Sequence, residues 1–195
     1  MKKVLLSLAV LTLALAAAQA QPILKKGSVD FAAGVGLVPT YVADGAHINM
    51  LPVNVRLGYR ISNNFSMSAF AAYSASEKNN VVRPDESIEN IKNQDLTLGL
   101  RGAVHAIRAE RFDVYGGFML GYNMPNTDIT QVSGPKTETP LPGGLTPSFS
   151  RPATNKLTYS GFIGASYLTG RNLGFFGEVG YGISLFNVGM QWKLR

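Results

Sequence analysis

The sequence predicts an all-β protein, an eight-stranded antiparallel up-and-down transmembrane β-barrel. Three observations lead to this fold class. Apolar and polar residues alternate along eight segments, which is the period of a β-strand. Each segment has about 10 to 13 residues, close to the 9–11 that a tilted strand needs to cross a bilayer. Only 15% of the 195 residues are charged, against about 25% in a typical soluble domain, so we expect one surface to face a medium other than water.

Residues 1–20 have the parts of a cleaved export signal, and residues 21–195 are expected to form one outer-membrane β-barrel domain. Lys2 and Lys3 precede an apolar run that ends in the small-residue pattern Ala18-Gln19-Ala20, as in secretory signal peptides. The apolar run is shorter than the roughly 18 residues that a transmembrane helix needs. We therefore expect cleavage and export to the bacterial outer membrane rather than a helical anchor.

The composition excludes several classes of function. The chain has no cysteine, so it forms no disulfide and carries no lipidated N-terminal cysteine. Its formal charge of +6 includes the two lysines of the export signal, and the other basic residues are scattered, which argues against nucleic-acid binding. Two histidines without cysteine do not complete a zinc shell, so we expect no metal and no cofactor.

The eight predicted strands are recognised by rows of apolar residues at alternate positions. These rows begin at Val29, Val53, Phe65, Leu96, Val114, Leu157, Leu173 and Phe186. The positions between them carry mostly Gly, Ser, Ala and Asn, with a few charges. In chain order, the predicted strands are 28–38, 51–61, 65–76, 95–107, 112–124, 156–169, 173–182 and 186–195.

The connections between the strands alternate in length, as in outer-membrane barrels, which have short periplasmic turns and longer external loops. Short turns are predicted at 62–64, 108–111 and 170–172. Longer polar loops are predicted at 42–48, 79–94 and 125–155, and the last is rich in proline and expected to be mobile. Both termini then fall in the periplasm, and the short external connection near Ile183 is the exception.

The apolar face is expected to contact lipid, although a soluble lipocalin-like barrel with its apolar face inward alternates too. A solvated outer face would carry many Lys and Glu residues, whereas small residues suit the crowded interior of an eight-stranded barrel. Aromatic residues toward both strand ends indicate girdles at the two headgroup interfaces. Toward the turns these are Tyr59, Phe65, Phe112, Tyr167 and Trp192. Toward the loops they are Tyr41, Tyr73, Tyr122, Tyr159 and Tyr181.

Three segments, together with the signal and the eight strands, resemble a known family. They are Val55 to Ser62, Gly177 to Gly182 and Asn187 to Lys193. Over essentially the whole mature chain, the pattern is similar to the small outer-membrane β-barrel family that includes OmpX and the OmpA barrel. The resemblance implies insertion by the barrel-assembly machinery, which usually reads a terminal aromatic residue. This chain ends in Leu194-Arg195, and Trp192 is the aromatic residue nearest to that end.

Charged residues on the inward face are the candidate functional residues, because a charge removed from water is costly unless it is paired. Arg56, Arg101 and Glu178 are expected at mid-membrane depth. Glu178 is predicted to bridge to Arg101 or to Arg56.

A second group, Asp30, Arg60 and Lys193, is expected near the periplasmic end. Asp30 is predicted to pair with Arg60 or with Lys193. The family resemblance implies that such an interior ion network plugs the lumen. The alternative is a charged lining around a narrow passive pore for ions or small solutes.

No enzymatic role is expected. Some eight-stranded barrels modify lipid A, and they need a histidine with a serine and a carboxylate near the outer leaflet. His105 is expected to project inward near the periplasmic end as a hydrogen-bonded packing residue. His47 is expected in the first external loop beside Asp44, with no evident nucleophile. We therefore assign no catalytic residue.

The expected function is structural or interactive, with a monomeric, side-chain-filled barrel supporting external loops at the cell surface. Surface adhesion is a variant of this role. Its expected partners are outer-membrane lipid and lipopolysaccharide, whose phosphates favour Lys and Arg, and simple solvation of the loop charges is an equal alternative. The external basic residues are Lys78, Arg83, Lys92, Lys136 and Arg151.

Overall fold

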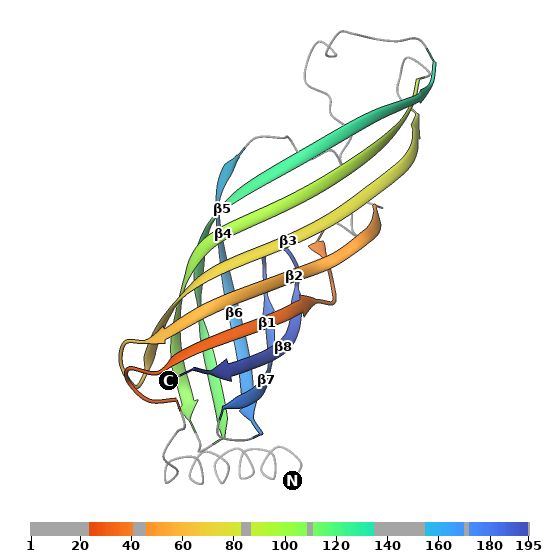
Figure 1. Ribbon diagram of the computed structural model, residues 1–195. Helices are drawn as coiled ribbons and strands as arrows, with labels where there is room; N and C mark the ends of the chain where they lie inside the picture. The colour runs from red at the N-terminus through yellow and green to blue at the C-terminus, as the bar shows by residue number, and fades with distance from the viewer. Residues whose placement is uncertain are drawn as a thin grey trace, which may run out of the picture.

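The computed structural model describes residues 24–40, 46–82, 87–108, 111–134, 155–169 and 172–194. Within these ranges eight strands form one closed antiparallel barrel, in which β8 returns to pair with β1 (Figure 1). The strands are β1 (Val29–Gly36), β2 (His47–Arg60), β3 (Phe65–Val82), β4 (Ile88–Arg108), β5 (Phe112–Ser133), β6 (Lys156–Leu168), β7 (Leu173–Gly180) and β8 (Phe186–Lys193). The predicted up-and-down topology is confirmed.

Some of the predicted features lie outside the described residues. They are the export signal at 1–20, Tyr41, Asp44, Arg83, and the segment 135–154 with Lys136 and Arg151. No helix in the part of the chain that the structure describes is long and apolar enough to span a bilayer.

Large apolar side chains lie on the outer surface of the barrel. Leu100 on β4 and Phe118 on β5 are 58% and 79% exposed. Polar residues at alternating positions, such as Asn54 on β2 and Ser74 on β3, are buried. Because successive side chains of a strand point to opposite faces, the barrel is apolar outside and polar inside.

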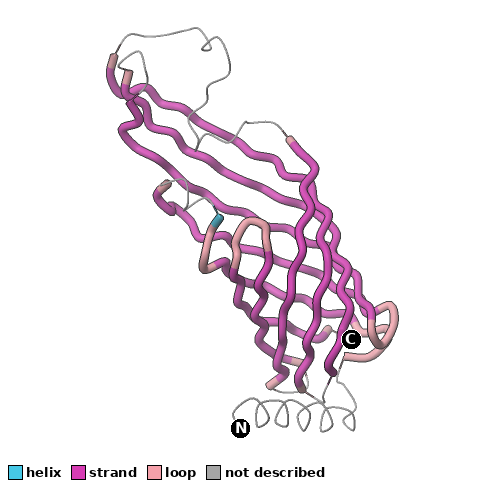
Figure 2. Tube along the Cα trace, turned by 180° about the vertical axis from the view of Figure 1, so that it is seen from behind, coloured by secondary structure: helices cyan, strands magenta, loops and turns pink. Residues whose placement is uncertain are grey.

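The wall of the barrel is much taller on one side than on the other (Figure 1 and Figure 2). β3, β4 and β5 contain 18, 21 and 22 residues, whereas β1, β7 and β8 contain 8 each. The predicted loop at 79–94 is therefore wrong over most of its length, since β3 continues to Val82 and β4 begins at Ile88. The loop predicted from residue 125 is wrong up to Ser133, where β5 ends.

The parts of β3, β4 and β5 that extend beyond the predicted strands carry mostly polar residues. They therefore lack the alternation that marks a membrane strand. Backbone pairing continues in them nevertheless, for example between Gln94 on β4 and Asn126 on β5. Pro125 is accommodated because β6 begins opposite Asn123, so the proline lies beyond the part of β5 that pairs with β6. β2 likewise begins at His47, inside the first predicted loop.

The three extensions form a structure that we call the blade. It consists of residues 77–82, 88–94 and 126–133. On β4 the outward positions change from Leu96 to Gln94 and Lys92, and on β5 they change from Tyr122 to Asn126. The apolar outer band therefore ends at the base of the blade.

Replacing Leu100 by arginine tests whether this band contacts hydrocarbon. Leu100 lies near the middle of the apolar row on β4, where a charge facing lipid costs about 2–4 kcal/mol. We expect Leu100→Arg to lower the free energy of unfolding by that amount in lipid vesicles, measured by urea titration. Asn126→Arg, on the outward face of the blade, is the matched control and should change it by less than about 0.5 kcal/mol. Equal costs at both sites would contradict a lipid-facing band.

Candidate functional site in the barrel lumen

Glu178 on β7 is the centre of the polar contacts inside the barrel. Its carboxylate accepts hydrogen bonds from Arg56 on β2 (2.5 Å), Arg101 on β4 (2.9 Å) and the Tyr115 hydroxyl on β5 (2.8 Å). We call these four residues the central ion cluster. The structure thus places the three predicted mid-depth residues together, and Glu178 contacts both arginines rather than one.

Aromatic rings inside the lumen flank the two arginines. The Arg101 guanidinium lies 3.8 Å from the centroid of the Phe162 ring and 5.4 Å from that of Phe70. The Arg56 guanidinium lies 4.8 Å from the centroid of Phe176. Ring faces attract cations, and more strongly when water is absent, so these aromatic residues help to hold desolvated arginines in place.

Sequence reasoning missed these inward aromatic residues because it treated aromatic side chains as members of the girdles. Strand parity was the available signal. Phe176 has the same parity as Glu178, and Tyr115 the same parity as Asp113, so each pair shares a face of its strand. The lumen is therefore filled by aromatic rings as well as by the small residues that were expected.

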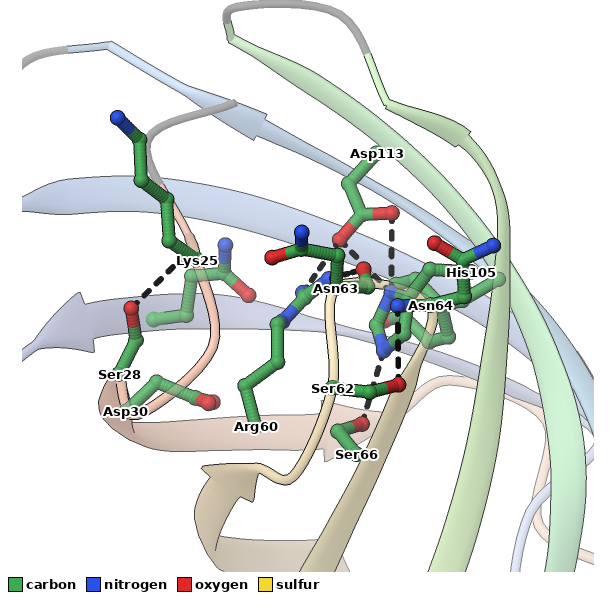
Figure 3. Close-up of polar contacts among 12 residues, drawn as sticks. Lys25, Ser28, Asp30, Arg60, Ser62, Asn63, Asn64, Ser66, His105 and Asp113 are labelled. Carbon is green, nitrogen blue, oxygen red and sulfur yellow. Dashed lines mark hydrogen bonds and ion pairs between the residues drawn. The ribbon is translucent and has the colours of Figure 1, made fainter. Parts of the chain in front are cut away.

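A second cluster lies nearer the tight turn between β2 and β3 (Figure 3). Asp113 on β5 accepts from Arg60 Nη2 (2.7 Å) and lies 2.8 Å from His105 Nδ1. His105 Nε2 lies 2.8 Å from the Ser66 hydroxyl. We call Arg60, Ser66, His105 and Asp113 the lower cluster. His105 is hydrogen-bonded in the lumen, and its contacts with Ser66 and Asp113 are not predicted by the sequence pattern.

In the structure Arg60 does not pair with Asp30. Arg60 contacts Asp113 across the lumen, and the Asp30 carboxylate lies 4.0 Å from Arg56 Nε. Asp30 is also the register partner of Lys193 on β8. The prediction of an Asp30–Arg60 pair considered only neighbouring strands, whereas a long side chain in a narrow lumen reaches a strand on the far wall.

Two cavities lie on either side of the central ion cluster. The upper cavity has a volume of about 400 Å³ and is lined by polar residues that include Asp95, Asn123 and Lys156. The lower cavity has a volume of about 30 Å³ and is lined in part by buried Leu24. Arg101, Phe162 and the lower cluster therefore leave little free space toward the turns.

The aromatic residues predicted to form girdles lie mostly on the outside. The exposed ones are Tyr59, Phe65, Phe112, Tyr122, Tyr159, Tyr167 and Tyr181. Tyr73 and Trp192 are half-buried, and the Trp192 ring packs 5.8 Å from the ring of Phe31 on β1. Tyr159 and Tyr181 are the most accessible, at 83% and 72%.

The remaining titratable groups offer no metal site, because the described ranges contain no group of three His, Cys, Asp or Glu residues that could hold an ion. His47 is exposed at the start of β2, in register opposite Glu77 on β3. The polar chemistry of the described part of the lumen therefore centres on the two clusters.

Comparison with known proteins gives a family match and a likeness of fold. Residues 6–193 match the family model described as "Outer membrane protein beta-barrel domain". No curated protein matches the chain. Among solved structures, the chain is similar to the outer membrane protein OprG from Pseudomonas aeruginosa, with 12% identity, a TM-score of 0.55, and coverage of 88% of this chain and 97% of that chain. Ail, the attachment invasion locus protein of Yersinia pestis, aligns at 10% identity with a TM-score of 0.45, covering 86% of this chain and 95% of that chain.

Replacing Glu178 by alanine removes the acceptor that the two arginines share. A buried ion pair broken from one side typically costs about 3–5 kcal/mol, because the remaining charge has lost its partner. We expect Glu178→Ala to lower the free energy of unfolding by about that amount. Glu77→Ala, which removes a blade carboxylate bound by Asn49, should cost less than about 1 kcal/mol. Equal values for the two variants would show that the cluster adds no stability.

Proposed function

Because this chain belongs to the outer membrane protein β-barrel domain family, we propose that it is a plugged, non-conducting barrel of the bacterial outer membrane. Its role is structural and interactive, with the blade and the adjoining external loops presented at the cell surface. The export signal is removed, and both termini lie in the periplasm. The close pairing of the two ends of the barrel supports this arrangement, since the Leu194 N–H donates to the Val29 carbonyl (2.8 Å).

The observation that carries the plug is the position of the central ion cluster between the two cavities. Arg56, Arg101 and Glu178 reach toward one point from β2, β4 and β7, and eight strands enclose a lumen that side chains can fill. The lower cavity has room for only one or two water molecules at about 30 Å³. A continuous water path would require these groups to move apart.

A narrow passive pore is the second candidate function. The upper cavity, with about 400 Å³ and walls of both polar and apolar residues, would be its outer vestibule. In that case the central ion cluster would be the gate, and transient separation of Glu178 from its arginines would admit ions. The plugged barrel is favoured because the cluster has several simultaneous contacts, all of which would have to break.

Conductance in planar bilayers separates the two functions. We expect no steady conductance from the refolded wild type. A triple variant with Arg56→Ser, Arg101→Ser and Glu178→Ser shortens the side chains that cross the lumen, so it should produce resolvable ion-conducting steps. Steady, ion-selective conductance of the wild type would overturn the plug and establish the pore.

The proposed role includes no chemistry on membrane lipid. His105 lies inside the lumen, and its contacts are with Ser66 and Asp113. His47 is exposed beside the blade. The outward rows that would meet lipid are apolar or aromatic, so the substrate of a lipid-modifying enzyme would find no histidine or carboxylate there within the described outer band.

Lipopolysaccharide is the proposed partner of the blade and loops, and a monomer is sufficient for this contact. Lys78 and Lys92 are the blade cations in the described residues, and Lys92 lies in register opposite Glu77 and Asp128. Cations at the upper edge of the apolar band are placed to meet lipid phosphates. If these lysines are simply solvated, they do not contribute to binding of lipopolysaccharide.

Charge reversal distinguishes the two explanations. We expect Lys78→Glu with Lys92→Glu to lose most of the stabilisation that lipopolysaccharide gives the wild-type barrel, measured as the shift of the thermal unfolding midpoint. Lys193→Glu, at the opposite end of the barrel, should keep the shift relative to its own baseline without lipopolysaccharide. An unchanged shift in the double variant would show that the lysines are solvated charges that do not bind lipopolysaccharide.

A further inference from the structure

Ser66, His105 and Asp113 form a linear hydrogen-bonded series across three adjacent strands of the lower cluster (Figure 3). The Ser66 hydroxyl on β3 lies 2.8 Å from His105 Nε2 on β4. His105 Nδ1 lies 2.8 Å and 3.0 Å from the two carboxylate oxygens of Asp113 on β5. A hydroxyl, an imidazole and a carboxylate in this order and at these distances are the arrangement that activates a serine for nucleophilic attack.

The carboxylate determines which imidazole nitrogen carries the proton. An ionised carboxylate only accepts hydrogen bonds, so Nδ1 of the neutral imidazole donates to Asp113. Nε2 then has a free lone pair, and the Ser66 hydroxyl donates to it. Arg60 contacts the same carboxylate at 2.7 Å and holds it in place. His105 is therefore positioned to take a proton from Ser66.

The lower cavity gives this series a place for a small reactant. Ser66, His105 and Asp113 all line it, and so do Ser68 and Gln191. Ser66 is half-buried rather than fully buried. The buried Nε2 atom of Gln191 has no hydrogen-bond partner within the described residues. A buried donor without an acceptor is costly, so it favours a reactant that brings an oxygen atom into this cavity.

We propose that Ser66 is an activated nucleophile that accepts a small acyl group from esters reaching the lower cavity. Ser66 Oγ bonds to the carbonyl carbon while its proton passes to His105 Nε2. The tetrahedral adduct collapses, the bond from carbon to the leaving oxygen breaks, and His105 returns the proton to the departing alcohol. The products are an ester on Ser66 and a free alcohol, with no change in oxidation state. Asp113 is the positioning residue for His105.

The size of the cavity limits the acyl group. At about 30 Å³ the cavity holds one or two water molecules, so the acyl group that Ser66 retains can be no larger than acetyl. The leaving group has to project out of the cavity. An acetyl group that fills this space also displaces the water needed to hydrolyse the new ester. The site is thus one of covalent modification rather than of rapid turnover. It goes beyond the proposed surface role and does not depend on whether the barrel conducts.

Acetylation by p-nitrophenyl acetate tests the proposal on the refolded full-length mature barrel in detergent. Peptide mapping by mass spectrometry reports the acetylated serine and its rate. General-base assistance is worth about 10²–10⁴-fold, so we expect Ser66 to be acetylated at least about a hundredfold faster than Ser68. p-Nitrophenyl octanoate has the same leaving group and should not label Ser66, because the octanoyl group that would remain on the serine exceeds the cavity.

Matched variants keep the result interpretable. Ser66→Ala removes the nucleophile and leaves the contacts between His105, Asp113 and Arg60. Ser74→Ala alters a buried serine of the same strand that lines neither cavity, and it should leave Ser66 labelling unchanged. His105→Gln should reduce Ser66 labelling about a hundredfold. If His105→Gln does not fold, as judged by gel migration without heating, Asp113→Asn should lower the Ser66 labelling rate about a hundredfold or more, because the amide no longer fixes the His105 proton on Nδ1. Labelling of Ser66 at the rate of Ser68, or a Ser66 rate that neither His105→Gln nor Asp113→Asn lowers, would overturn the proposal.

Discussion

The need to pair every backbone amide without help from water is the constraint on which the rest of this structure depends. In hydrocarbon an unpaired N–H or C=O costs several kcal/mol, so a sheet that spans a membrane must close on itself. Here closure is made by β1 and β8, whose register runs from Asp30 opposite Lys193 to Gly36 opposite Asn187. Closure with eight strands creates a lumen narrow enough for side chains to fill. The polar interior and its contacts follow from that geometry.

The narrow lumen explains why its charged residues act together. A single carboxylate, Glu178, is reached by side chains from β2, β4 and β5 because the walls are only a side chain apart. Charges at this depth must be paired to be tolerated, and the aromatic rings of Phe162 and Phe176 complete their surroundings. The same crowding places Ser66 beside His105 in the lower cluster. Interior chemistry in this barrel is therefore a consequence of packing across the axis.

The wall of the barrel can differ in height because the requirement to pair every backbone amide applies only where the strands are surrounded by lipid. Within the apolar band each strand pairs on both sides, and proline or a polar outer row would be costly. Above the band water can satisfy an edge, so β5 accommodates Pro125 and the three strands β3, β4 and β5 continue beyond it as the polar blade. The change from Leu96 to Lys92 on one strand marks where the requirement changes. The blade and the barrel are thus parts of one sheet, of which the barrel is surrounded by lipid and the blade by water.

The sequence by itself determined the strand number, the two faces and the identity of the inward charges, because alternation is a local property that each strand carries. Arg56, Arg101 and Glu178 could be placed on the inward face from parity alone, and the aromatic residue Phe176 could have been added by the same rule. Only the tertiary structure decided that β3 and β4 extend through a predicted loop, that Arg60 contacts Asp113, and that Ser66, His105 and Asp113 lie in series. These features depend on the stagger between strands and on distances across the closed barrel, and no local pattern in the chain encodes either.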